Sequence, residues 1–140
     1  MNTKEIEILL VEDDPVDVMN VRRAFAKARV GWPLHVAADG REALELLRGP
    51  LSSVSQNLPR IILLDINMPR MNGLEFLREL RADPTLRSIS VFVLTTSNEK
   101  ADLRAAYHHN VSGYILKPLS SRDFLKVITT LKHYWEICEY

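Results

Sequence analysis

The stretch Ile61-Ile62-Leu63-Leu64, followed at once by Asp65, is the most apolar of the predicted strands and decides the fold. A continuous apolar run of this length is typical of a strand that is buried on both faces of a parallel sheet. Segments with helical spacing flank it on both sides along the chain, which predicts a place in the middle of a sheet covered by helices. The carboxylate of Asp65 is therefore expected at the sheet edge, shielded by neighbouring strands.

Outward from that stretch, short apolar runs alternate with longer segments in which apolar residues recur every three to four positions. Gly and Pro residues separate them, and Asp14 before Pro15 is a plausible helix start. Five alternations in 140 residues predict an α/β fold with an open, doubly wound parallel sheet. The pattern predicts strands over residues 6–11, 34–38, 61–64, 91–95 and 114–116, helices over 15–30, 43–48, 74–82, 100–109 and 121–134, and a long loop over 49–60.

Length and composition predict one soluble domain, residues 1–140, with a core over about 6–134 and a tail over 135–140. Hydrophobic residues make up 46% of the chain, and 18 basic side chains balance 18 acidic ones. We expect no disulfide, since Cys138 is the only cysteine, and no membrane span, since apolar runs are short. The even charge and the absence of a helix-turn-helix after the last helix argue against DNA binding. A cytoplasmic location is expected.

The predicted strands end in polar residues suited to one kind of chemistry. Ligands of such sheets bind beyond the carboxyl ends of the strands. If the first and third strands are neighbours, three carboxylates meet there and require a cation, for which Mg²⁺, with Mn²⁺ as the alternative, suits oxygen ligands. A lysine and a hydroxyl beside them would hold a phosphoryl group, with the central carboxylate as its acceptor. These residues are Glu12, Asp13, Asp65, Thr95 and Lys117.

Each of these features has an ordinary explanation when taken alone. Acids such as Glu12 and Asp13 often open a helix, an Asp at a strand end often forms a turn, and Lys117-Pro118 could be a loop. Four strand ends that each supply what one phosphoryl site needs are much harder to explain by chance. The combination therefore favours the phosphoryl site.

At this point the sequence resembles a known family, the receiver domains of two-component response regulators. The resemblance covers residues 6 to about 134 and implies a flavodoxin-like sheet of order 2-1-3-4-5 with five helices. It also implies a sensor histidine kinase as the partner that donates the phosphoryl group. The runs that carry it are Ile8-Leu9-Leu10-Val11-Glu12-Asp13-Asp14, Leu63-Leu64-Asp65-Ile66-Asn67-Met68-Pro69 with Gly73, Val93-Leu94-Thr95-Thr96-Ser97, and Gly113-Tyr114-Ile115-Leu116-Lys117-Pro118.

The resemblance also implies a role for each site residue. Asp65 would be the phosphoacceptor and a metal ligand. The other metal ligands would be Glu12, Asp13 and the backbone carbonyl of Asn67. Thr95 and Lys117 would contact the acyl phosphate, Tyr114 would be the aromatic switch, and Asn67 and Ser97 would tune dephosphorylation.

The end of the chain is aromatic. If the last helix continues, an apolar stripe forms at spacing i, i+3, i+4 and i+7 from Leu131, Tyr134, Trp135 and Cys138. This tail either folds back on the domain or completes a homodimer interface with the fourth helix, fifth strand and fifth helix. The tail and the long loop at 49–60 resemble stand-alone receivers that pair with phytochrome-type histidine kinases in bacteria.

Three functions compete for this sequence. A signalling receiver would take a phosphoryl group from a kinase, and a hydrolase would use Asp65 as nucleophile on external phosphate esters. Such phosphatases usually carry a second acid two residues after the nucleophile, where this chain has Asn67. A third option, a non-phosphorylated interaction module, would normally have lost Asp65, Thr95 or Lys117. We therefore expect a receiver that modifies itself and is not a turnover enzyme.

Overall fold

The computed structural model describes residues 7–49, 61–68, 71–95, 100–117 and 121–137. These residues form a five-stranded parallel sheet in the order β2-β1-β3-β4-β5, as expected. The strands are β1 (Ile8–Val11), β2 (Leu34–Ala37), β3 (Ile61–Asp65), β4 (Ser90–Thr95) and β5 (Gly113–Leu116). The helices are α1 (Pro15–Ala28), α2 (Gly40–Arg48), α3 (Gly73–Ala82), α4 (Lys100–Tyr107) and α5 (Ser121–Ile137).

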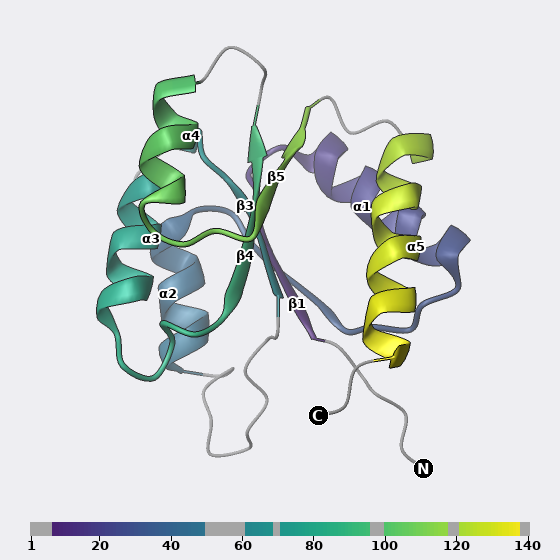
Figure 1. Cartoon of the computed structure of the whole chain (residues 1–140), viewed down its shortest axis with the longest axis horizontal. Coiled ribbons are helices and arrows are strands. Elements are labelled where there is room, and N and C mark those ends of the chain that lie inside the picture. Colours follow the sequence, from purple (N-terminus) through teal and green to yellow (C-terminus); the bar gives the residue numbers. More distant parts are fainter. Residues whose placement is uncertain (1–6, 50–60, 69–70, 96–99, 118–120, 138–140) are drawn as a thin grey trace.

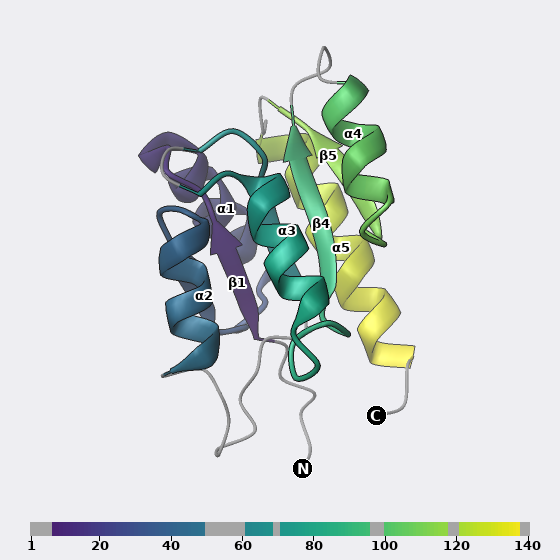
Figure 2. The same ribbon diagram turned by 90° about the vertical axis from the view of Figure 1, so that its left-hand side faces the viewer.

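The fold has three layers. Helices α1 and α5 pack side by side on one face of the sheet, and α2, α3 and α4 cover the other (Figure 1). The arrowheads of β1 and β4 point the same way in Figure 2, so the carboxyl ends of the strands meet at one edge of the sheet. Short apolar strands with helices on both faces of the sheet are the arrangement that the continuous apolar runs predict.

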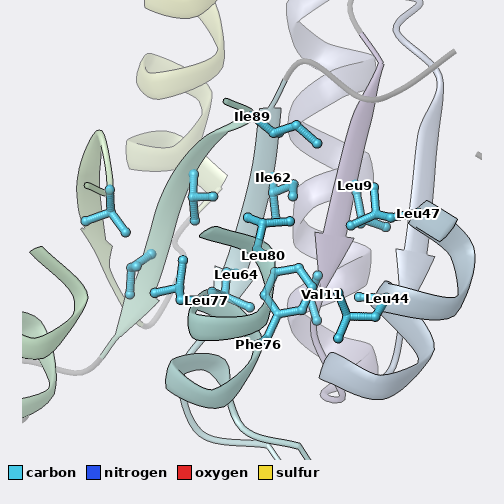
Figure 3. Packing of buried hydrophobic residues seen from close by; sticks show 14 of the residues in the cluster. Leu9, Val11, Leu44, Leu47, Ile62, Leu64, Phe76, Leu77, Leu80 and Ile89 are labelled. Atoms are coloured by element: carbon cyan, nitrogen blue, oxygen red, sulfur yellow. The ribbon is translucent and has the colours of Figure 1, made fainter. Parts of the chain in front are cut away.

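Alternate residues of the strands divide into two cores. Leu9, Ile62 and Leu64 face α2 and α3 and belong to one core with Leu47 and Phe76 (Figure 3). Leu10 and Leu63 face α1 and α5 and pack in the second core. Since strand side chains alternate with a period of two, the same short run supplies both cores.

Side-chain caps fix where the helices begin. Asp14 accepts a hydrogen bond from the Val16 backbone N–H at 2.8 Å, and Pro15 occupies the first helical position. At the start of α3, Asn72 and Glu75 form a capping box with contacts of 2.9 and 3.0 Å. These caps satisfy backbone donors that the first helical turn leaves unpaired.

The end of α3 is tied to the turn that leads into β5. Arg81 donates to the carbonyl oxygens of His109, Asn110 and Ile89 at 2.7, 3.1 and 2.8 Å, and also to that of Arg87. Asn110 in this turn has a φ of 58°, in the left-handed region. The turn therefore ends α4 at Tyr107, two residues before the predicted end at position 109.

The last helix is longer than the prediction, because α5 continues past Tyr134 to Ile137. Leu131 is half-buried and packs against the core under α1 and α5, so the domain covers this part of the predicted stripe. Tyr134 is 55% exposed. The side chain of Trp135, Cys138 and residues 50–60 of the loop predicted over 49–60 lie outside the described residues. Among the described helices, none combines the length and apolarity that crossing a bilayer requires.

Candidate functional site

Three carboxylates meet at the carboxyl edge of the sheet. Strand β1 lies beside β3 with Val11 opposite Leu64, so the residues that follow the two strands become neighbours. Glu12, Asp13 and Asp65 each place a carboxylate oxygen within 4.8 Å of the others. Glu12 and Asp65 are buried, at 2% and 5% exposure, and Asp13 is exposed. The convergence predicted from the sequence is therefore present.

The backbone after β3 is held by the first residue of α3. The Gly73 N–H donates to the carbonyl oxygen of Ile66 at 2.9 Å. A Cβ at Gly73 would lie 2.7 Å from the Ile66 Cα and 2.8 Å from the carbonyl oxygen of Asp65, closer than van der Waals contact allows. Only glycine permits this approach. Nearby, the Asn67 N–H donates to Asp65 Oδ1 at 3.2 Å, which orients the carboxylate.

Lys117 brings a positive charge to these acids. Its Nζ lies 2.9 Å from Glu12 Oε1, 3.0 Å from Asp17 Oδ2 and 3.5 Å from Asp65 Oδ2. The contact between the Lys117 ammonium and the buried Glu12 Oε1 is an ion pair. The Lys117 backbone N–H donates to the Thr95 carbonyl oxygen at 2.7 Å, which fixes where the side chain starts.

Burial dominates the electrostatics of the site. Desolvation raises the pKa of Glu12 to about 7; the charge of Asp65 adds to this rise and Lys117 opposes it. Desolvation also raises the pKa of Asp65, against the lowering effect of Lys117. Burial alone would lower the pKa of Lys117, but its contacts with Glu12 and Asp17 outweigh burial and raise it. The acids are therefore crowded and short of positive charge, whereas the lysine stays protonated.

Thr95 lies on β4, which pairs with β3, and Tyr114 lies on β5, which pairs with β4 at the end of the sheet. Thr95 ends β4, is 1% exposed and pairs in register with Leu116. Tyr114 on β5 is 46% exposed, and its ring packs edge-on against that of Tyr107, with the centroids 6.3 Å apart. Asn67 is exposed beside Asp65, while Ser97 lies outside the described residues.

Asp17 was not predicted as part of the site. It lies in the first turn of α1, is 9% exposed and contacts Lys117. A signal for it is present in the sequence, because Asp17, Val21, Ala24 and Phe25 follow helical spacing and all four are buried. An acid on the apolar stripe of a helix is expected to have a partner of opposite charge.

This arrangement suits a divalent cation and a phosphoryl group. Hard carboxylate oxygens are the ligands that Mg²⁺ and Mn²⁺ prefer, and three carboxylates within 4.8 Å of one another, two of them buried, fit a site that requires added positive charge. Asp65 offers a nucleophilic carboxylate next to the ammonium group of Lys117.

Comparison with known proteins assigns the family. The model of the response regulator receiver domain matches residues 8–129, nearly the whole chain and all of these site residues. The chain belongs to the response regulator receiver family. This receiver is 39% identical over 128 residues to the probable methanogenesis regulatory protein FilR2 of Methanothrix harundinacea. The match covers 91% of this chain and 82% of FilR2. It is 33% identical over 128 residues to the response regulator Rcp1 of Synechocystis, with 91% and 87% covered.

The receiver is similar in structure to solved response regulators, one of them a phytochrome response regulator. The phosphorylated cyanobacterial phytochrome response regulator RcpA superposes with a TM-score of 0.79 at 32% identity, covering 97% of each chain. The Mn²⁺-bound form of Rcp1 superposes with a TM-score of 0.77 at 31% identity, covering 96% of this chain and 97% of that one. The family and the fold expected from the sequence are thereby confirmed.

Proposed function

We propose that this receiver accepts a phosphoryl group on Asp65 from a phosphohistidine of a sensor histidine kinase, and that it acts through the resulting change of its surface. The observation that carries the proposal is the placement of the Asp65 carboxylate. It lies 3.5 Å from the Lys117 ammonium and within the acidic cluster that it forms with Glu12 and Asp13. A nucleophile, a fixed cation and a divalent cation site thus share one edge of the sheet.

The transfer follows from these groups. An oxygen of the ionised Asp65 carboxylate attacks the phosphorus of the phosphohistidine in line with the bond to nitrogen. An O–P bond forms and the P–N bond breaks, and its electron pair returns to the imidazole, which takes up a proton. The product is an acyl phosphate on Asp65, and Lys117 lies where its charge offsets that of the phosphoryl oxygens.

Mg²⁺, or Mn²⁺ in its place, would be held by Glu12, Asp13, Asp65 and the backbone carbonyl of Asn67. When bound, the cation neutralises the crowded acids and stabilises the charge on the transferring oxygens. The solved structure of Rcp1 in a Mn²⁺-bound form supports this choice of ion. Within the chain itself, the Asn67 N–H orients the Asp65 carboxylate, and burial of Asp65 limits access of water.

The consequence of phosphorylation is a local rearrangement. The phosphoryl group adds charge and three acceptor oxygens, which would draw the Thr95 hydroxyl and Lys117 toward it. Tyr114 would then turn inward from its exposed position on β5. Asn67 and Ser97 would tune the lifetime of the acyl phosphate. The receiver modifies itself in this scheme and turns over no external substrate.

We infer a phytochrome-type kinase in the cytoplasm as the partner. The likeness to RcpA, a cyanobacterial phytochrome response regulator, supports this inference. We also propose a homodimer through α4, β5, α5 and the tail, because large apolar side chains are exposed on these elements. They are Tyr107, Tyr114, Leu116, Tyr134 and Ile137. Light scattering should then give twice the mass of one chain for the intact protein and the mass of one chain for a protein truncated after Leu131.

The acceptor is tested by labelling with acetyl phosphate and Mg²⁺, followed by intact-mass measurement. The wild type should gain one phosphoryl group that hydroxylamine removes, and Asp65→Asn should gain none. Asp14→Asn is the control, since it removes a nearby acid that caps α1 and lies outside the metal-binding cluster. Equal labelling of the wild type and Asp65→Asn would contradict the assignment of the acceptor.

A further inference from the structure

We propose that Asp17 is a positioning residue that holds the Lys117 ammonium back from Asp65 in the resting receiver and thereby weakens binding of a phosphoryl group at the acceptor. The inference rests on the proposed function, because it concerns the same acceptor. It adds a residue of α1 to a site that is otherwise built from strand ends.

The distances around Lys117 carry the proposal. The ammonium group has three protons to donate, and three carboxylates lie around it. Glu12 and Asp17 are the near partners, at 2.9 and 3.0 Å, and Asp65 is the distant one, at 3.5 Å. The charge of Lys117 is therefore shared, and its two shorter contacts are with acids other than the acceptor.

The surroundings of Asp17 show why this contact matters. Asp17 occupies a buried position on the stripe of α1 that Val21 and Phe25 continue into the core. An apolar residue there would pack with less loss of hydration, since a buried carboxylate is costly unless it is paired. Within the described part of the chain, Lys117 is the ion-pair partner found for Asp17. The ion pair with Lys117 is therefore the contact that makes burial of this acid favourable.

Phosphorylation changes the competition for Lys117. The acyl phosphate carries more negative charge than the carboxylate it replaces. Lys117 must then shift its contacts toward the phosphoryl oxygens, and the Asp17 contact opposes this shift. Removal of the Asp17 charge should therefore strengthen binding at the acceptor. The same contact links occupancy of the acceptor to the first turn of α1.

The experiment measures the affinity of the full chain for beryllofluoride in the presence of Mg²⁺, as a mimic of the phosphoryl group. Asp17→Asn keeps the size of the side chain and removes its charge, so the ion pair with the Lys117 ammonium is replaced by a weaker contact between that ammonium and a neutral amide oxygen. We expect about fivefold tighter binding than in the wild type, which is the size of effect expected when one contact between opposite charges is weakened.

Asp14→Asn is the matched control. It removes the same charge from the same end of α1, and asparagine caps a helix as well as aspartate does. Lys117 forms ion pairs with Glu12, Asp17 and Asp65 among the described residues, and Asp14 is not one of them. Asp14→Asn therefore reports the effect of removing a negative charge in general, and it should tighten beryllofluoride binding less than Asp17→Asn does. Equal effects of the two variants, or weaker binding by Asp17→Asn, would overturn the proposal.

A second readout requires neither metal nor beryllofluoride. The NMR signal of the Lys117 ε-methylene, assigned by its loss in Lys117→Gln, should shift in Asp17→Asn and stay in place in Asp14→Asn. An unshifted signal in Asp17→Asn would overturn the proposal. Asp17→Ser, which adds no bulk, should act in the same direction in both measurements if Asp17→Asn folds poorly.

The two measurements separate this proposal from the function on which it rests. If the wild type binds beryllofluoride and Asp17→Asn matches Asp14→Asn, the role of Asp17 is wrong and the acceptor assignment stands. If the wild type fails to bind, the proposed function is contradicted, and with it the restraint on Lys117.

Discussion

Strands β3 and β5 each deliver one charged group to the same site, but their surroundings differ. All five residues of β3 are buried, and the strand pairs with β1 on one side and β4 on the other. Strand β5 alternates half-buried and exposed residues and, among the described strands, pairs with β4 alone. Asp65 thus ends a strand held on every side, whereas Lys117 follows the edge strand of the sheet (Figure 1).

These surroundings explain how one site can combine an acceptor that is held in place with a lysine that rearranges. Displacing β3 would disturb both cores, because Leu63 and Leu64 face opposite sides of the sheet. Displacing β5 disturbs less packing, since Tyr114 and Leu116 are about half exposed and the half-buried Ile115 packs against one core. The acceptor carboxylate is therefore held rigidly, and a rearrangement that follows its modification costs least at the strand that carries the lysine.

The largest expected effect compares a leucine from each strand. Leu63→Ala removes a fully buried side chain, and we expect a loss of about 2–5 kcal/mol in the free energy of unfolding. Leu116→Ala removes a side chain that is 50% exposed, and we expect a loss of about 0.5 kcal/mol. Urea denaturation of both variants measures the difference. Similar losses would show that β5 is as firmly held as β3.

The next effect concerns the buried acid beside Asp65. The unfolded chain releases the Glu12 proton near pH 4.5, but burial raises its pKa to about 7 in the folded protein. The native state therefore binds more protons over this interval, and the free energy of unfolding should fall as pH rises from about 4.5 to 7. The raised pKa of Asp65 acts in the same direction. We expect a total change of about 1–3 kcal/mol without metal.

Glu12→Gln isolates this effect, because it removes the buried charge and keeps the shape of the side chain. The variant should be more stable than the wild type at pH 8 and should show a flatter dependence on pH. Glu45→Gln, on the exposed face of α2, is the matched control and should follow the wild type. Denaturant unfolding at several pH values measures all three proteins. A steeper profile in Glu12→Gln would contradict a raised pKa of Glu12 as the source of the pH dependence.

The smallest expected effect concerns the two tyrosine rings that pack between α4 and the edge strand β5. Tyr107 and Tyr114 pack edge-on across α4 and β5. A double-mutant cycle with Tyr107→Leu and Tyr114→Leu should give a coupling of about 0.5–1 kcal/mol in the free energy of unfolding. If Tyr114 turns inward on phosphorylation, the coupling should vanish in the beryllofluoride-bound protein. A coupling that persists there would argue against movement of the ring.

Much of the fold could be predicted because its signals are local. Short apolar runs and helical spacing located every strand and helix, and Asp14 with Pro15 marked the start of α1 as observed. Helix ends were less predictable. Helix α4 ends at Tyr107 because Arg81 binds the carbonyls of the turn beyond it, a contact that joins segments 28 residues apart in the chain.

The sequence by itself determined which residues stand at the strand ends, since each follows directly on an apolar run. The resemblance of the sequence to receiver domains then implied the strand order. How the charge of Lys117 is shared depends on the tertiary structure. Its Nζ lies nearer to Glu12 and Asp17 than to Asp65. The physical reason is that apolar periodicity is set by neighbours along the chain, whereas the distances around an ammonium group depend on how a helix and three strands pack together.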